Sequence, residues 1–198
     1  MEDVMYKLCK TEQSTKRQRD IEDCLLSLLE EKHYDDITIT ELCERFGMPR
    51  KAFYRYFDSK DGALYALIEH TYLTYGGFTP EGSKKKRTLR EEMSGFFTFW
   101  YQKKSFLDAM NRSGLLPKVI EISLSFPIND YLIISKFLPH QTPWEREQIF
   151  KFTAGGLLIL VMDWYKSGFK ADIASMAAVA EKILESQLFS RLDDIGSY

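Results

Sequence analysis

Repeated amphipathic stripes constrain the fold of this chain more than any other feature of its sequence. Apolar residues recur three and four positions apart in one segment after another, as at Ile21, Cys24, Leu25 and Leu28. This spacing places the apolar side chains on one face of an α-helix. No stretch shows the sustained alternation of apolar and polar residues that marks a half-buried strand. We therefore expect an all-α protein whose helices pack through these faces.

Helix boundaries are marked by capping signals. Four Thr residues are each followed three positions later by Glu or Gln, the spacing of a capping box, at Thr15, Thr38, Thr88 and Thr142. Gly47 is placed to end the helix that begins after Thr38, and Ser59 is placed to begin another. Four helices are expected in the first part of the chain. The first begins after Thr15, the second and third span 38–47 and 50–57, and the fourth begins at Ser59. Those that follow lie after Thr88 and at 105–113, 115–137, 142–167 and 172–191, and the helix at 115–137 is expected to be interrupted or kinked at Pro127.

The chain is long enough, at 198 residues, to form one or two compact units. Helix-breaking residues accumulate only around 76–83. The expected organisation is a first domain at 1–77, a linker at 78–87 and a second domain at 88–198. The linker ends in a basic run, 84–87, which fits either a solvated loop or a DNA contact.

Composition indicates a soluble globular protein, with 44% hydrophobic and 28% charged residues. The longest apolar run, 154–162, is far short of the roughly 20 residues that a membrane-spanning helix needs. The first ten residues lack the apolar core of a secretory signal. The sequence predicts a cytoplasmic protein with no membrane partner.

Charge does not by itself point to nucleic acid. The net charge is −2, and residues 1–77 carry eleven Lys and Arg against fifteen Asp and Glu. Positive charge is nevertheless concentrated locally, because Arg50, Lys51, Arg55 and Lys60 stand within eleven residues, opposed only by Asp58. If DNA is the partner, this segment has to supply the contact.

Residues 38–57 read as a helix, a turn that contains Gly47 and a second short helix. Taken alone, the pattern also fits an ordinary helical hairpin. The second helix, however, presents Arg50 and Lys51 beside Tyr54, a mixture suited to phosphates and base edges. Its apolar residues Phe53 and Phe57 are four apart, so they can pack inward together. We therefore interpret the segment as a DNA-binding helix-turn-helix.

The run from Ile37 to Leu64, above all Phe53 to Lys60 (FYRYFDSK), resembles the N-terminal domain of TetR-family regulators. The specific resemblance covers about residues 15–72. It implies an N-terminal three-helix helix-turn-helix domain and a C-terminal helical bundle for ligand sensing and dimerisation. The function that it implies is a sequence-specific transcriptional regulator. Such a protein would act as a homodimer on palindromic double-stranded DNA, with repression as the usual mode and an unknown small molecule as effector.

Carried over residue by residue, the resemblance gives Thr38 and Thr40 a DNA backbone or base contact. Arg50, Lys51 and Ala52 would face the major groove, and Tyr54 and Lys60 would hold phosphates. The full DNA-binding set is Thr38, Thr40, Arg50, Lys51, Ala52, Tyr54, Arg55, Tyr56 and Lys60.

Two positions depart from the family pattern. Tyr56 stands where the family often has His, and Pro49 stands where it commonly has a capping Ser. Pro49 cannot supply a hydroxyl, although Pro is compatible with the start of a helix. Lys51 and Arg55 also fit ordinary solvated charges, and Tyr54 also fits simple packing.

The second domain is rich in aromatic residues, which fit a packed core as well as a ligand cavity. Under the family resemblance the candidate cavity residues are Trp100, Met110, Phe126, Tyr131 and Phe152. The last two helices carry glycines and alanines that suit close helix–helix packing, between subunits or within one chain. The candidate dimer-interface residues are Gly155, Gly156, Leu160, Ala177, Ala180 and Leu184.

An enzyme and a co-regulator that acts through a partner protein are the two alternatives to a DNA-binding regulator. An enzyme is not expected, because His33, His70 and His140 are scattered and no metal, nucleophile or phosphate-binding motif is present. No cofactor is expected either. The acidic balance of residues 1–77 keeps open a co-activator or co-regulator of the same fold that works mainly through a partner protein, with weak direct DNA binding.

Overall fold

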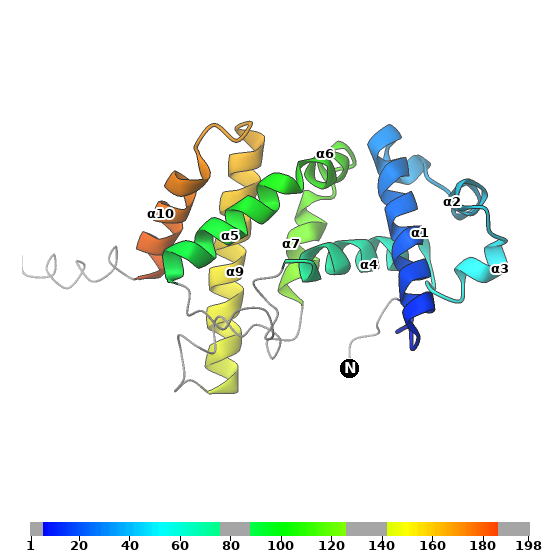
Figure 1. The fold of residues 1–198 in the computed structure, drawn as a ribbon, viewed down its shortest axis with the longest axis horizontal. Coiled ribbons are helices and arrows are strands. Elements are labelled where there is room, and N and C mark those ends of the chain that lie inside the picture. The colour runs from blue at the N-terminus through cyan, green and yellow to red at the C-terminus, as the bar shows by residue number, and fades with distance from the viewer. Residues whose placement is uncertain (1–5, 76–87, 126–141, 186–198) are drawn as a thin grey trace, which may run out of the picture. The chain divides into compact units, whose positions relative to one another are not determined.

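The computed structural model describes residues 6–75, 88–125 and 142–185 (Figure 1). Within these ranges the backbone forms α-helices, one short 3-10 helix and an isolated β-bridge, so the predicted all-α class is confirmed. None of the helices in these ranges is long and apolar enough to span a membrane. The chain divides into two compact units, 1–74 with 105–125 and 75–104 with 126–198.

The first unit is built around α1. Its elements are α1 (Glu12–Glu31), η1 (Tyr34–Asp36), α2 (Ile39–Phe46), α3 (Arg50–Phe53), α4 (Lys60–Leu73), α6 (Lys104–Arg112) and α7 (Leu116–Leu124). Helix α1 packs against α2 and α4, α2 packs against α3, and α4 packs against α7. The apolar stripe predicted for α1 forms the core, since Ile21, Leu25 and Leu28 are fully buried. The short helices thus take their positions from α1 and α4.

Several predicted boundaries are confirmed by the hydrogen bonds that cap them. The Thr38 side chain accepts from the Glu41 amide at 3.1 Å and begins α2, and Gly47 ends it in the left-handed region (φ 76°). The Ser59 side chain caps α4 in the same way. Reciprocal capping boxes at Thr88 and Thr142 begin α5 and α9. These signals are local, so the sequence carries them in full.

Three boundaries differ from the prediction. Helix α1 begins four residues earlier than expected, because Thr11 and Ser14 form its capping box and Thr15 lies inside the helix. Helix α3 ends at Phe53, so the helix predicted over 50–57 is a single turn followed by irregular turns. The helix predicted over 115–137 is α7, which ends at Leu124; Pro127 lies outside the described residues.

The second unit contains α5 (Leu89–Gln102), α9 (Pro143–Lys166) and α10 (Ile173–Leu184). Helix α5 packs against both α10 and α9 (Figure 1). Aromatic rings fill the core. The ring centroids of Phe97 and Trp164 lie 5.7 Å apart and those of Trp164 and Phe169 lie 4.7 Å apart, and both pairs are edge-to-face. Such pairs add to the free energy gained from burial alone. Much of the aromatic content of this unit therefore serves packing.

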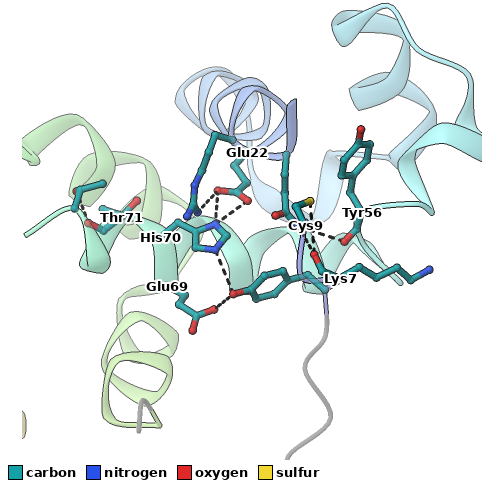
Figure 2. A network of polar contacts seen from close by, with 11 residues as sticks. Lys7, Cys9, Glu22, Tyr56, Glu69, His70 and Thr71 are labelled. Atoms are coloured by element: carbon teal, nitrogen blue, oxygen red, sulfur yellow. Dashed lines mark hydrogen bonds and ion pairs between the residues drawn. The ribbon is translucent and has the colours of Figure 1, made fainter. Parts of the chain in front are cut away.

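A buried polar network joins α1, α4 and the segment before α1 (Figure 2). Glu22 of α1 is 2% exposed and His70 of α4 is 8% exposed. The Nδ1 atom of His70 lies 2.9 Å from both carboxylate oxygens of Glu22, and Arg19 donates to the same carboxylate at 3.2 Å. Two bare acceptors would repel each other at this distance, so one proton must lie between Glu22 and His70.

The other side of the imidazole faces the hydroxyl of Tyr6. His70 Nε2 lies 3.2 Å from this oxygen, and the hydroxyl donates to Glu69 at 2.5 Å. Since the single hydroxyl hydrogen of Tyr6 goes to Glu69, the Nε2–H of His70 donates to Tyr6. The network therefore fixes the N-terminal segment to α4 directly and to α1 through the contact between His70 and Glu22.

The pH dependence of stability should report on this network. Burial, partly opposed by Arg19, raises the pKa of Glu22 from 4.5 to about 8. The folded state therefore holds this proton more tightly than the unfolded chain. Its stabilising contribution is complete below pH 4.5 and is lost as the pH rises through about 8.

A Glu22→Gln variant cannot ionise at this position. It should gain stability relative to the native protein as the pH rises from about 5 to about 8. Urea denaturation at several pH values measures the difference in the free energy of unfolding. A difference that stays constant across this range would contradict the assignment.

Candidate nucleic-acid interface

Helix α3 is held in place by two aromatic anchors. Phe53 and Phe57 are fully buried, and their ring centroids lie 5.3 Å apart. Pro49 is the N-cap, with φ near −70°, and makes no side-chain capping bond. The amide of Ala52 bonds to the Pro49 carbonyl at 2.8 Å and closes the turn. The anchors thus determine which residues of this segment face outward.

The outward face of this segment is cationic. Arg50, Lys51 and Arg55 are all exposed. Tyr54 is 40% exposed, with its ring edge-to-face against Phe53 at 5.5 Å. Within residues 6–75, 88–125 and 142–185, none of the three cations takes part in an ion pair. The guanidinium and ammonium groups are therefore available to an external partner.

Several other cations of the first unit are already paired with carboxylates. Arg45 makes a two-pronged ion pair with Glu31 at 2.5 and 2.6 Å. Lys32 bonds to Glu41 at 2.5 Å. The ion pairs that involve Arg19, Lys16 and Lys7 have Glu22, Asp20 and Asp58 as their acidic partners. These cations are thus neutralised locally by carboxylates, while the three cations beside α3 are not.

The remaining predicted DNA contacts lie close by in sequence, with mixed exposure. Thr38 and Thr40 are exposed at the start of α2, although the Thr38 oxygen already caps that helix. Ala52 and Tyr56 are half-buried. The DNA contacts assigned to these four residues remain predictions.

Lys60 has partners inside the protein. Its ammonium donates to the Tyr34 carbonyl at 2.8 Å and to the Ile37 carbonyl at 2.7 Å, and it lies 4.1 Å from the centre of the Tyr34 ring. These contacts hold the loop between α1 and α2 against the start of α4. The phosphate contact implied by the family resemblance remains a prediction, and the structure gives this side chain another role.

Comparison with known proteins bears directly on this segment. Residues 25–67 match the family model described as "Bacterial regulatory proteins, tetR family". The chain carries a tetR-family N-terminal domain. The match covers α2, α3, the last part of α1 and the first part of α4, so the resemblance seen in the sequence is confirmed. A comparison with curated protein sequences gave no match.

Several solved structures, among them a tetR-family regulator, share the fold of this chain over most of its length. A tetR-family transcriptional regulator from Streptomyces coelicolor has a TM-score of 0.55 at 15% identity and covers 90% of this chain and 83% of its own. The regulator FadR from Bacillus subtilis, in complex with stearoyl-CoA, has a TM-score of 0.55 at 14% identity and covers 84% and 96%. The dihydroxyacetone kinase operon activator DhaS has a TM-score of 0.53 at 15% identity and covers 86% and 94%.

At these identities the likeness establishes the fold. Together with the tetR-family domain, it supports a DNA-binding transcriptional regulator.

The candidate ligand residues fall in both units, and two of them lie outside the described residues. Trp100 is buried in the second unit, in an edge-to-face contact with Phe99. Met110 is buried in the first unit, whereas Phe152 of the second unit is 74% exposed. Phe126 and Tyr131 lie outside the described residues. The predicted ligand cavity therefore remains a prediction.

The candidate dimer residues fall into three groups by exposure. Ala177 and Ala180 are fully buried on α10, which packs against α5 within the chain. Gly156 is exposed, and a Cβ atom added there would meet no atom within 4 Å. The half-buried members are Gly155, Leu160 and Leu184.

Sequence reasoning missed two features of possible functional importance. Phe152 and Ile159 are exposed by 74% and 57% on α9, and their spacing of seven places them on the same side of the helix. The amphipathic pattern could have shown this stripe, but the near-continuous apolar run around it hides the face. The second feature is the N-terminal segment at Tyr6 and Lys7, whose partners lie far away in the sequence.

Replacement of Lys60 should separate its internal role from a phosphate contact. Lys60→Met removes two hydrogen bonds from a charged donor, so we expect a loss of about 1–3 kcal/mol in the free energy of unfolding, measured in urea. The salt dependence of DNA binding should stay the same. Arg55→Met is the control, since Arg55 is exposed and in no ion pair among the described residues, so the change should leave stability unchanged and reduce the salt slope by about one unit. A stable Lys60→Met protein with a reduced salt slope would reverse the assignment.

Proposed function

We propose that this protein is a sequence-specific DNA-binding repressor that acts as a homodimer and responds to a small-molecule effector. One observation carries the proposal. Arg50, Lys51 and Arg55 are exposed and lack ion-pair partners among the described residues, while neighbouring cations are paired. A surface of this kind attracts a polyanion even when the unit as a whole is acidic.

The chemistry of these side chains suits double-stranded DNA. A guanidinium presents a fork of donors that matches the O6 and N7 acceptors of guanine in the major groove. Lys51 can make the same contact or bind a phosphate, and Tyr54 can donate to a phosphate oxygen. We assign base reading to Arg50 and Lys51 because they belong to the helical turn itself, and we assign backbone contacts to Tyr54 and Arg55.

Exposed apolar side chains on the last two helices support a homodimer. On α9 these are Phe152 and Ile159, and on α10 they are Val179 and Ile183. An apolar surface of this kind marks a protein interface. Gly156 would allow a second copy of α9 to approach closely. In a twofold dimer the two α3 helices would enter successive major grooves about 34–36 Å apart, so the operator should be palindromic.

An effector is the least supported part of the proposal, and its support comes from a structural neighbour. The Bacillus subtilis FadR structure contains stearoyl-CoA. We propose a long-chain acyl thioester as the first ligand class to test for this chain. A ligand that binds better to a conformation with the wrong spacing of the two α3 helices would weaken operator binding by linkage.

One observation favours activation over the repression that we propose. The neighbour DhaS is described as an operon activator. A co-activator or co-regulator acting mainly through a partner protein would fit the acidic balance of residues 1–77. Such a protein would have weak direct DNA affinity, so a direct binding measurement separates it from the repressor that we propose.

Arg50→Ala should lower affinity for the selected operator by about 1–3 kcal/mol, because one bidentate base contact is lost. The loss should be much smaller on a site in which the contacted base pair is changed. Fluorescence anisotropy at one fixed salt concentration measures both. Lys118→Ala on α7 removes the same charge from the same unit and serves as the control. Equal losses at matched and mismatched sites would rule out base reading by Arg50.

Addition of stearoyl-CoA should raise the thermal midpoint and weaken operator binding by about 5- to 150-fold, the usual range of allosteric coupling. Free coenzyme A is the control, since it lacks the acyl chain. Scanning calorimetry and anisotropy on the same samples give the two quantities. Acyl thioesters that stabilise the protein without weakening DNA binding would contradict the proposed mechanism.

A further inference from the structure

The segment before α1 crosses the end of the predicted recognition element. Tyr6 and Phe57 form an isolated antiparallel bridge. The Lys7 amide donates to the Tyr56 carbonyl at 2.8 Å, and the Lys7 ammonium donates to the Tyr54 carbonyl at 2.8 Å. The same ammonium lies 3.5 Å from Asp58. Lys7 thus bonds twice to the main chain immediately after α3, beside the bridge between Tyr6 and Phe57.

Both sides of this segment are fixed to the core of the first unit (Figure 2). Gln18, buried on α1, donates to the Lys7 carbonyl at 3.0 Å and lies 3.5 Å from the Tyr56 carbonyl. The hydroxyl of Tyr6 donates to Glu69 and lies against His70 on α4. The segment therefore connects the exit of α3 to α1 on one side and to α4 on the other.

A single helical turn needs this support. Helix α3 contains four residues, and the irregular turns that follow it donate to the carbonyls of Arg50, Ala52 and Phe53. The Lys7 ammonium bonds to the carbonyl of Tyr54, the C-cap of α3, where a cation also interacts favourably with the helix dipole. Phe53 and Phe57 fix the inner face of the segment, and α2 packs against α3 at its start. The bonds from Lys7 to the Tyr54 and Tyr56 carbonyls add a separate attachment at the end of the segment.

We propose that Tyr6 and Lys7 form a strap that fixes the orientation of α3, and that they are positioning residues for DNA reading although neither needs to touch a base. The proposal rests on the function proposed above. Its consequence is specific: loss of the strap lowers discrimination between operator and non-operator DNA more than it lowers non-specific binding. Loss of a lysine that only contacts phosphate would instead weaken binding to operator and non-operator DNA equally.

Two matched pairs of variants test the strap. Lys7→Gln and Lys10→Gln each remove one exposed positive charge from the same segment, but only Lys7 bonds to Tyr54. Tyr6→Phe and Tyr34→Phe each remove a buried phenol–carboxylate hydrogen bond, at 2.5 and 2.6 Å, but only Tyr6 belongs to the strap. All four substitutions keep the shape of the side chain or affect an exposed group, so the variants should fold.

The first readout is amide hydrogen exchange of the free protein over residues 50–58. Lys7→Gln and Tyr6→Phe should speed exchange in this peptide by about three- to tenfold, the range for loss of one hydrogen bond. The two control variants should not change it. This measurement needs no DNA, so it judges the strap independently of the proposed function.

The second readout is the ratio of affinities for the selected operator and for a scrambled duplex. The strap variants should lower this ratio by about three- to tenfold, and the controls should leave it unchanged. An unchanged ratio for both strap variants, or an equal fall for Lys7→Gln and Lys10→Gln, would overturn the inference. If the native protein itself shows no preference for any sequence, the proposed function fails and the DNA-reading role of the strap fails with it.

Discussion

Burial of Phe53 and Phe57 is the contact on which the rest of the site depends. A four-residue helix has almost no stability of its own, since the first turn of a helix gains too few hydrogen bonds to offset the order that it imposes. The two rings are fully buried in the first unit and in contact with each other, and every outward side chain takes its direction from that burial. The capping of α2 by Thr38 and Gly47 then determines how the chain arrives at Pro49.

Electrostatics in the first unit follows from which charges are paired. The ion pairs of Arg45 and Lys32 keep their carboxylate partners from opposing an incoming polyanion. Exposed ion pairs contribute little to stability. Their effect here is on the distribution of charge: the cations beside α3 remain available in a segment whose overall charge is negative. Net charge alone would have excluded a function that local charge supports.

Much of the fold could be predicted from the sequence, because its signals are local. The caps at Thr38, Gly47, Ser59 and Thr142 each need only a few neighbouring residues to be recognised. The helix-turn-helix and its exposed cations were predictable for the same reason. The start of α1 was missed because Thr11 pairs with Ser14, while the expected box at Thr15 has Gln three positions on.

What could not be predicted depends on contacts between distant residues. The end of α3 at Phe53 is accompanied by bonds from Lys7 to the next residues, and no local pattern reveals them. The placement of Lys60 on the carbonyls before α2 is equally invisible in the motif that contains it. The Glu22–His70 pair looks in the sequence like two unrelated polar residues on helices. Ring packing in the second unit likewise separates core from surface only once α5, α9 and α10 are assembled.

The most direct test of the account is the selection of bound duplexes from random DNA by the purified full-length protein. The account predicts enrichment of a palindrome whose two half-sites are centred about 10–10.5 base pairs apart, since two copies of α3 would read successive major grooves. Enrichment of single half-sites would contradict the twofold arrangement. If no sequence is enriched at moderate salt, the exposed cations of α3 do not read DNA.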